Sequence, residues 1–170
     1  MKKILVIFIN LIILVNFNFA QEKLPKTKRS ECKNHFGITG GYSTGYGISY
    51  LYQENKFGLQ ATFSPYYNDN RKFTNFALTG LYLLQKGQNI NLMMYLSNDW
   101  TSIIRKNSYD SSVWESMKSK TGIGLAYQMY MSPKYKICFY TGYSVLYFKD
   151  EYDKYVGFAP DGGVSLYFMF

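Results

Sequence analysis

Charged side chains are scarce in this sequence and absent from long parts of it. Asp, Glu, Lys and Arg make up 18% of the 170 residues, slightly less than the aromatic residues at 19%. No charge occurs in residues 57–67, 73–84, 90–98 or 121–131. A soluble protein needs charge spread over its surface to stay dispersed. The composition therefore argues against a soluble enzyme.

Residues that commonly carry catalysis or bind metals are also few. The chain has one histidine, His35, and two cysteines, Cys32 and Cys138, which lie too far apart for a metal-ligand spacing. It contains no Walker or His-Glu-x-x-His motif, and its Gly-x-Ser-x-Gly pattern at 41–45 is not followed by a predicted helix, as a nucleophile elbow would require. The sequence therefore predicts no catalytic, cofactor-binding or metal-binding residue. A disulfide between the two cysteines is a side prediction, which requires the N-terminal tail to tuck into the fold.

Residues 1–20 have the order of a secretory signal peptide. Two lysines precede an apolar stretch at 4–19, and Ala20 precedes a polar run. We predict cleavage after Ala20. The alternative is a retained membrane helix, for which the stretch is short and interrupted by asparagines. Residues 21–34 then form a linker. Its basic cluster at 23–29 favours a solvated segment over nucleic-acid binding, with lipid headgroup phosphates as a third possibility.

From residue 35 onward the chain alternates between apolar and polar residues, and no long window has helical periodicity. The clearest case is 57–64, where Phe, Leu, Ala and Phe alternate with Gly, Gln, Thr and Ser. Repetition of this pattern predicts about eight strands, several near the roughly nine to eleven residues that cross a bilayer. Short turns alternate with longer loops, except for a short break at 43–45. The turns are expected at 53–56, 85–89 and 132–134, and the loops at 66–72, 99–120 and 149–155.

The polar face of these strands carries almost no charge. This lack of charge indicates which face of the sheet points into the barrel and which points outward. A soluble lipocalin-like barrel would turn its apolar face inward and a charged face to water. We instead predict that Leu59 and Leu92 face lipid while Gln60 and Gln128 fill the interior. Closure removes the sheet edges, and eight strands leave room only for side chains, so we expect no open channel. Interfacial aromatics are expected at Tyr66, Tyr67, Trp100, Trp114, Tyr147 and Tyr155.

The last strand, at residues 163–170, ends on Phe170 with Val164, Leu166 and Phe168 at alternate positions before it. This resembles the C-terminal signal that the barrel assembly machinery reads in outer-membrane barrels. The plan of residues 35–170 resembles the small eight-stranded OmpX/OmpA-like family, and its glycine- and tyrosine-rich stretches at 37–42, 47–50 and 57–61 are similar to barrels of Bacteroidetes-type bacteria. The resemblance implies an all-β, closed antiparallel up-and-down transmembrane barrel in a bacterial outer membrane. Because proline cannot donate to a strand ladder, we start the last strand after Pro160.

Three hypotheses for function follow. The first is a monomeric structural or interaction barrel without enzymatic activity, which contacts lipid, lipopolysaccharide or an external partner through the loop at 99–120. The second is a lipid-modifying enzyme, although His35 is expected to be an interfacial residue on the short-turn side. The third is a secreted, soluble ligand-binding barrel. Candidates to meet phosphates are Arg105, Lys106, Lys118 and Lys120. Acids expected to be solvated in loops are Asp99, Asp110, Glu115, Asp150, Glu151 and Asp153.

Overall fold

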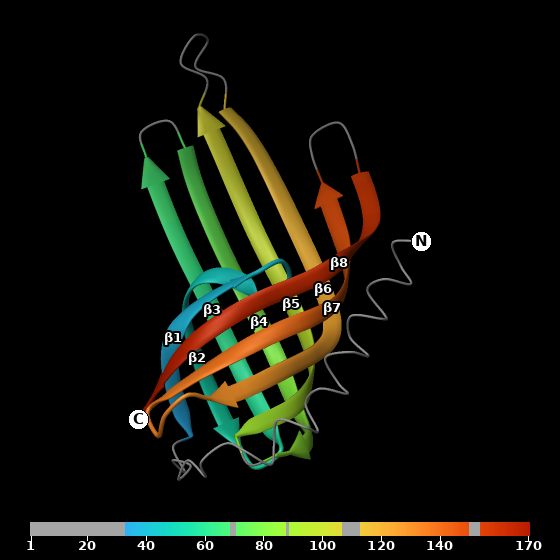
Figure 1. Ribbon diagram of the computed structural model, residues 1–170. Coiled ribbons are helices and arrows are strands. Elements are labelled where there is room, and N and C mark those ends of the chain that lie inside the picture. Colours follow the sequence, from blue (N-terminus) through green and yellow to red (C-terminus); the bar gives the residue numbers. More distant parts are fainter. Residues whose placement is uncertain (1–32, 69–70, 88, 107–112, 150–153) are drawn as a thin grey trace.

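The computed structural model describes residues 33–68, 71–87, 89–106, 113–149 and 154–170. These residues form eight antiparallel strands in a closed up-and-down barrel, each strand pairing with its sequence neighbours and β1 with β8 (Figure 1). The predicted fold class is confirmed. The predicted signal peptide, Cys32 and most of the linker lie outside the described residues. Within the described residues, no helix has the length and apolarity that crossing a membrane requires.

The strands differ in length by more than a factor of two. They are β1 Asn34–Gly41, β2 Gly45–Glu54, β3 Phe57–Asn68, β4 Arg71–Lys86, β5 Ile90–Lys106, β6 Val113–Tyr130, β7 Tyr135–Lys149 and β8 Lys154–Met169. β1 pairs with β2 in register from Asn34↔Tyr52 to Gly41↔Gly45. The short break at 43–45, which departs from the alternation of short turns and long loops, therefore joins two paired strands.

Register around the barrel fixes the tilt of its strands. A path drawn perpendicular to the strands, from each residue to its paired residue on the next strand, starts at Ile38 of β1 and arrives at Val156 of β8. Ile38 itself pairs with Leu166, ten residues further along β8. A register offset of ten residues around an eight-stranded barrel corresponds to a strand tilt of about 40° from the barrel axis. At this tilt, the ten steps along the chain from Ile90 to Trp100 on β5 rise by about 25 Å.

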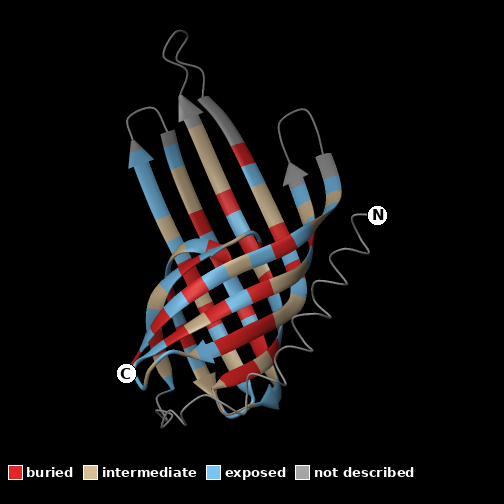
Figure 2. Ribbon diagram, in the orientation of Figure 1, coloured by how far each residue is buried: buried red, intermediate tan, exposed pale blue. Residues whose placement is uncertain are grey.

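The two faces of the sheet point as the sequence predicts. Leu59 and Phe63 are 57% and 47% exposed on the outer wall, whereas Gln60 and Gln128 are completely buried inside. Leu92 and Leu125 are partly exposed. Figure 2 shows buried and exposed residues alternating along the strands. Because side chains alternate with period two, one polar residue placed inside fixes the direction of all its neighbours in the strand.

Most of the predicted long loops are strand instead. β3 continues to Asn68 and β4 begins at Arg71. In the same way, β5 continues to Lys106 and β6 begins at Val113, while β7 continues to Lys149 and β8 begins at Lys154. The loop predicted at 99–120 is therefore mainly a two-stranded ladder, which includes the pair Asp99↔Lys120. Charged and polar residues at these positions indicate loops in the sequence, but opposite charges on paired strands are compatible with a ladder.

The barrel wall is uneven because the β1–β2 hairpin ends early. β4, β5 and β6 rise far beyond it (Figure 1). The β2–β3 ladder stops at Ile48↔Phe63, and the β1–β8 ladder stops at Gly41↔Gly163, while β3 and β8 continue. The upper parts of β3 and β8 therefore face each other across a gap that the hairpin does not fill.

Both edges of this gap carry a proline. The prediction that the last strand starts after Pro160 is wrong, because β8 runs through it from Lys154. The carbonyl of Gly162 accepts a hydrogen bond from the backbone N–H of Tyr42 at 3.0 Å, so alternate residues of β8 from Gly162 face β1. Pro160 is the next such residue and lies beyond the end of β1. A missing N–H there leaves no ladder partner unsatisfied.

Pro65 occupies the matching position on β3. The carbonyl of Lys56 accepts from the N–H of Leu83 on β4 at 2.7 Å, so the odd-numbered residues of β3 face β2. Pro65 is the first of these beyond Phe63, where the ladder with β2 ends. Both prolines thus remove a backbone donor from the side of the strand that has no partner. Prolines at unpaired edges also oppose the addition of a foreign strand.

Candidate functional site

Many bulky side chains are buried inside the barrel. Tyrosines from three strands lie across it, and the Tyr140 hydroxyl donates to Oε1 of Gln60 at 2.7 Å. The Tyr167 and Ser49 hydroxyls are 3.1 Å apart, and the rings of Tyr95 and Tyr140 meet edge to face. The buried apolar cluster consists of Leu51, Leu81, Met93, Tyr95, Ala126, Cys138, Tyr140 and Tyr167.

The tip of the β1–β2 hairpin packs inside the barrel. Ser43 is completely buried, and its backbone N–H donates to Oδ1 of Asp161 on β8 at 3.1 Å. The Ser43 hydroxyl donates to the other carboxylate oxygen and also contacts the hydroxyl of Ser97 on β5. The Tyr95 hydroxyl donates to Asp161 at 2.8 Å. The turn is therefore held against two strands on other parts of the wall. We refer to the hairpin tip, Tyr42–Ser43–Thr44, as the plug.

A second cluster holds the other side of the plug. Nζ of Lys120 lies 3.0 Å from Oδ2 of Asp99, donates to the carbonyl of Tyr42 at 3.1 Å and lies 4.7 Å from the centre of the Tyr42 ring. Asn75 donates to Asp99, and its own side-chain oxygen accepts from the backbone N–H of Tyr46 at 3.1 Å. A buried carboxylate is thus neutralised by a lysine that also holds the hairpin.

This cluster changes two expectations from the sequence. Asp99 was expected to be a solvated loop acid, but its side chain is completely buried and paired with Lys120. Lys120 was a candidate to meet external phosphates, but its ammonium group is committed to Asp99 and the plug. Lys118 is partly buried. For Arg105 and Lys106 the structure describes the strand but not the side chains. Asp161 is a site residue that the sequence pattern does not predict, and it is the only acidic residue between Lys154 and Phe170.

Gly122 on β6 leaves the space that the plug occupies. A Cβ at Gly122 would lie 2.0 Å from Oγ of Ser43 and 2.3 Å from Oδ2 of Asp161. We therefore expect Gly122→Val to displace the plug and to lower the free energy of unfolding by about 1–3 kcal/mol, as overpacking of a filled core does. Urea unfolding of the refolded protein measures this. Gly80→Val is the control because a Cβ at Gly80 meets only a carbonyl oxygen at 3.8 Å. Equal losses in the two variants would contradict the role of Gly122.

The lower half of the lumen contains a buried cation. Lys136 is completely buried, and Nζ donates to Oε1 of Gln53 at 2.9 Å and lies 5.5 Å from the centre of the Tyr167 ring. His35 is 3% exposed beside the same tyrosine, so the expectation of an interfacial histidine is wrong. Its position inside follows from the period-two alternation of β1. Cys138 is a completely buried free thiol on the same face as Lys136, and its predicted partner Cys32 is not described.

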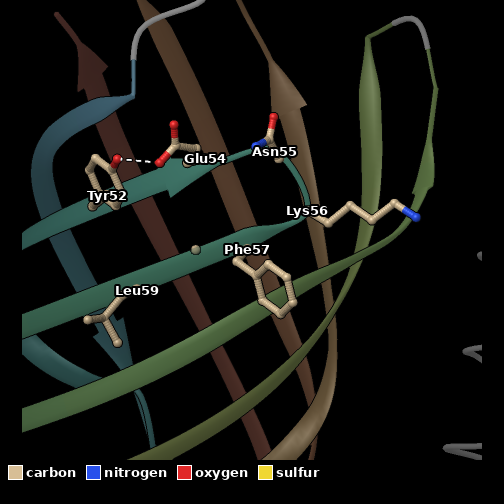
Figure 3. A pocket seen from close by; sticks show the side chains of 7 residues that line it. Tyr52, Glu54, Asn55, Lys56, Phe57 and Leu59 are labelled. Carbon is tan, nitrogen blue, oxygen red and sulfur yellow. Dashed lines mark hydrogen bonds between the residues drawn. The ribbon is translucent and has the colours of Figure 1, made fainter.

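The short-turn rim has its own charged cluster. Glu54, at the end of β2, accepts hydrogen bonds from Nζ of Lys33 and, at 2.7 Å, from the Tyr52 hydroxyl. The hydrogen bond and the negative charge of Glu54 raise the pKa of Lys33, which precedes β1. Beside this cluster an open groove of about 530 Å³ lies on the outer wall of the β2–β3 hairpin (Figure 3). Its lining is Tyr52, Glu54, Asn55, Lys56, Phe57, Gly58 and Leu59.

None of these clusters has the composition of a metal centre. Within the ranges that the structure describes, no three His, Cys, Asp or Glu residues are grouped so that they could hold a metal ion. The described clusters instead combine hydrogen bonds and two ion pairs, Lys33–Glu54 and Lys120–Asp99, that hold strands and hairpin together.

Comparisons with known proteins give structural likenesses only. No protein-family model matches the sequence, and no curated protein matches it significantly. The N-terminal β-barrel domain of Pseudomonas aeruginosa OprF is 14% identical with a TM-score of 0.46, covering 81% of this chain and 95% of that domain. Neisserial surface protein A (NspA) is 13% identical with a TM-score of 0.48, covering 81% and 94%. Ail, the attachment invasion locus protein of Yersinia pestis, is 16% identical with a TM-score of 0.43, covering 84% and 99%. These likenesses concern the barrel fold alone.

Proposed function

We propose that this protein is a barrel of a bacterial outer membrane that has no open channel and acts as a structural or surface-interaction protein, not as an enzyme. The observation that carries the proposal is the outer wall. Its large exposed side chains are apolar or aromatic, including Phe36, Ile48, Leu96, Ile123 and Leu166. Such a continuous apolar wall around a polar, filled interior suits hydrocarbon outside and not water.

The height of this wall supports the same placement. The segment of β5 from Ile90 to Trp100 rises about 25 Å, which matches the apolar band of outer-membrane barrels. Trp100 ends the band and stacks on Phe76 with ring centres 5.8 Å apart. Above it, Tyr66, Tyr67 and Tyr147 are exposed, as interfacial aromatics should be. The side chains of Trp114 and Tyr155 lie outside the described residues.

The gap between β3 and β8 is compatible with lipid because of its prolines. A backbone donor left unpaired in hydrocarbon costs several kcal/mol. Pro65 and Pro160 remove the donors that would otherwise point into the gap just above the hairpin. The plug then separates the packed lower lumen from the mouth that the long strands surround.

We further propose that the signal peptide is cleaved after Ala20 and that the barrel assembly machinery reads the strand ending at Phe170. The protein is then a monomer in contact with outer-membrane lipid and lipopolysaccharide, with an external partner at the ends of β5 and β6. Resemblance to Bacteroidetes-type barrels favours a source of that kind. The lipid-modifying alternative has little support, because His35 is buried at the short-turn end. It requires altered lipid A in the mass spectrum of producing cells, and loss of that change in His35→Ala.

Fractionation and electrophoresis test the proposal. We expect the protein in the outer-membrane fraction, insoluble without detergent, and migrating differently before and after heating because closed barrels stay folded in detergent. In planar bilayers we expect no stable ion conductance, since the lumen is filled and plugged. Recovery in the soluble fraction would refute the membrane placement, and steady conductance would refute the closed lumen.

A further inference from the structure

The short-turn rim of the barrel is rich in exposed lysines. In the sequence from 69 to 161, acidic and basic residues are equal in number once Lys86, Lys134 and Lys136 are set aside. The short-turn rim instead carries one exposed lysine on each turn, Lys56, Lys86 and Lys134, and a fourth at Lys33. Its one acid in the described residues is Glu54, so this rim is strongly basic.

Among the described residues, three of these lysines have no carboxylate partner at the rim. Glu54 is engaged by Lys33 and by the Tyr52 hydroxyl. Of the ion pairs made by described residues, the only other joins Lys120 to Asp99 inside the barrel. The positive charge of Lys56 is therefore not offset by an ion pair, although it lies two residues from Glu54.

The groove of Figure 3 joins this charge to an apolar surface. Phe57 is 66% and Leu59 57% exposed on the outer wall, with Tyr52 on the neighbouring strand. Lys56 lies at the turn, and its side chain extends away from these apolar groups. An apolar strip that ends in a cation has the same order of groups as a phospholipid that lies along it, with its chain on the wall and its phosphate at the turn.

We propose that this groove is a binding site for an anionic phospholipid of the leaflet at the short-turn end. The acyl chain lies against Tyr52, Phe57 and Leu59, and the phosphate meets Lys56. Lys86 and Lys134 extend the same recognition around the rim. This inference rests on the membrane placement proposed above, because the outer wall meets acyl chains only there.

Charge and position favour a lipid over a soluble anion or a protein partner. Lysines just outside an apolar band place their alkyl stems along it and their ammonium groups among headgroups. Each lysine near an anionic lipid surface contributes enough free energy for about a five-fold change in affinity. The arrangement of one lysine on each turn also suits a surface that surrounds the barrel rather than a partner on one side.

The test measures lipid retention. The full-length mature protein is inserted into vesicles of equimolar phosphatidylcholine and phosphatidylglycerol, released in mild detergent and examined by native mass spectrometry. We expect preferential retention of phosphatidylglycerol, reduced about five-fold in Lys56→Gln. Lys72→Gln is the matched control, since Lys72 is exposed near the other end on β4, and it should retain lipid as the parent does.

Each other outcome overturns the inference. No preference for phosphatidylglycerol, or equal loss in the two variants, would remove the site at Lys56. Displacement of the lipid by inorganic phosphate alone would mean that the groove recognises a free anion. Heat-dependent migration is measured on every variant to verify folding. If the membrane placement itself is wrong, the parent protein is recovered in the soluble fraction. If only the lipid site is wrong, it stays in the membrane without lipid preference.

Discussion

Replacing Lys120 with alanine should lower the free energy of unfolding by about 3–5 kcal/mol, because it leaves a buried carboxylate without its cation. The Asp99 side chain is completely buried, and Lys120 is its one ion-pair partner among the described residues. The variant also loses the hydrogen bond from Nζ to the Tyr42 carbonyl, which helps to hold the plug. Urea unfolding of the barrel in lipid vesicles, followed by tryptophan fluorescence, measures the change.

Two further variants separate the buried charge from the lost side chain. Lys120→Met combined with Asp99→Asn removes both charges while keeping similar volumes, so most of the lost stability should return. Lys72→Ala removes an exposed lysine on β4 and should change the free energy of unfolding by no more than about 0.5 kcal/mol. If the double variant is as unstable as Lys120→Ala, the unpaired charge on Asp99 is not the cause.

The barrel itself was predictable because its signal is local and repeated. Alternation in 57–64 fixes which side chains of β3 share a face, and the lack of charge at Gln60 and Thr62 identifies the face that turns inward. Closure follows from the cost of open edges. The strand ends were not predictable in the same way. Asp99, Lys118 and Lys120 look like loop residues when each strand is considered alone, and the pairing of β5 with β6 is what accommodates them.

The plug could not be derived from the sequence. Ser43 and Asp161 are separated by 118 positions, and no local pattern connects them. The available signals were Asp161 in an otherwise uncharged final segment and the short glycine-flanked turn at 41–45. Gly45 has a φ of 76°, which lets the chain turn back inside the barrel. Neither signal specifies that the turn bends into the lumen and not away from it.

The same limit applies to the partners of His35 and Lys136, because alternation gives the inward direction of these side chains but the stagger of the closing strands decides what they meet. His35 pairs with Met169 and lies beside Tyr167 only after β1 and β8 join. Lys136 reaches Gln53 across the lumen, although the two are 83 positions apart. A lysine in a sequence is normally assigned to the surface because burial of a charge is costly. Here its donors meet an amide oxygen and an aromatic ring.

An arginine at Leu96 should destabilise the barrel in vesicles by about 2–4 kcal/mol, whereas an arginine at Met117 should cost about 0–1 kcal/mol. The parent side chains are almost equally exposed, at 59% and 58%. What differs is their height on the wall. Leu96 lies six residues above the start of β5, near the middle of the apolar band. Met117 pairs with Ser102, about 15 Å further up.

The comparison separates a membrane barrel from a soluble one because exposure alone would treat the two positions alike. In water, each arginine would replace an exposed apolar side chain, and both changes should lie within about 0.5 kcal/mol of zero. In a bilayer, only the arginine at position 96 must be placed in hydrocarbon. Urea unfolding of both variants in the same vesicles gives the difference directly. A difference near zero would mean that no lipid surrounds the middle of the wall, and the apolar outer face would then need another covering.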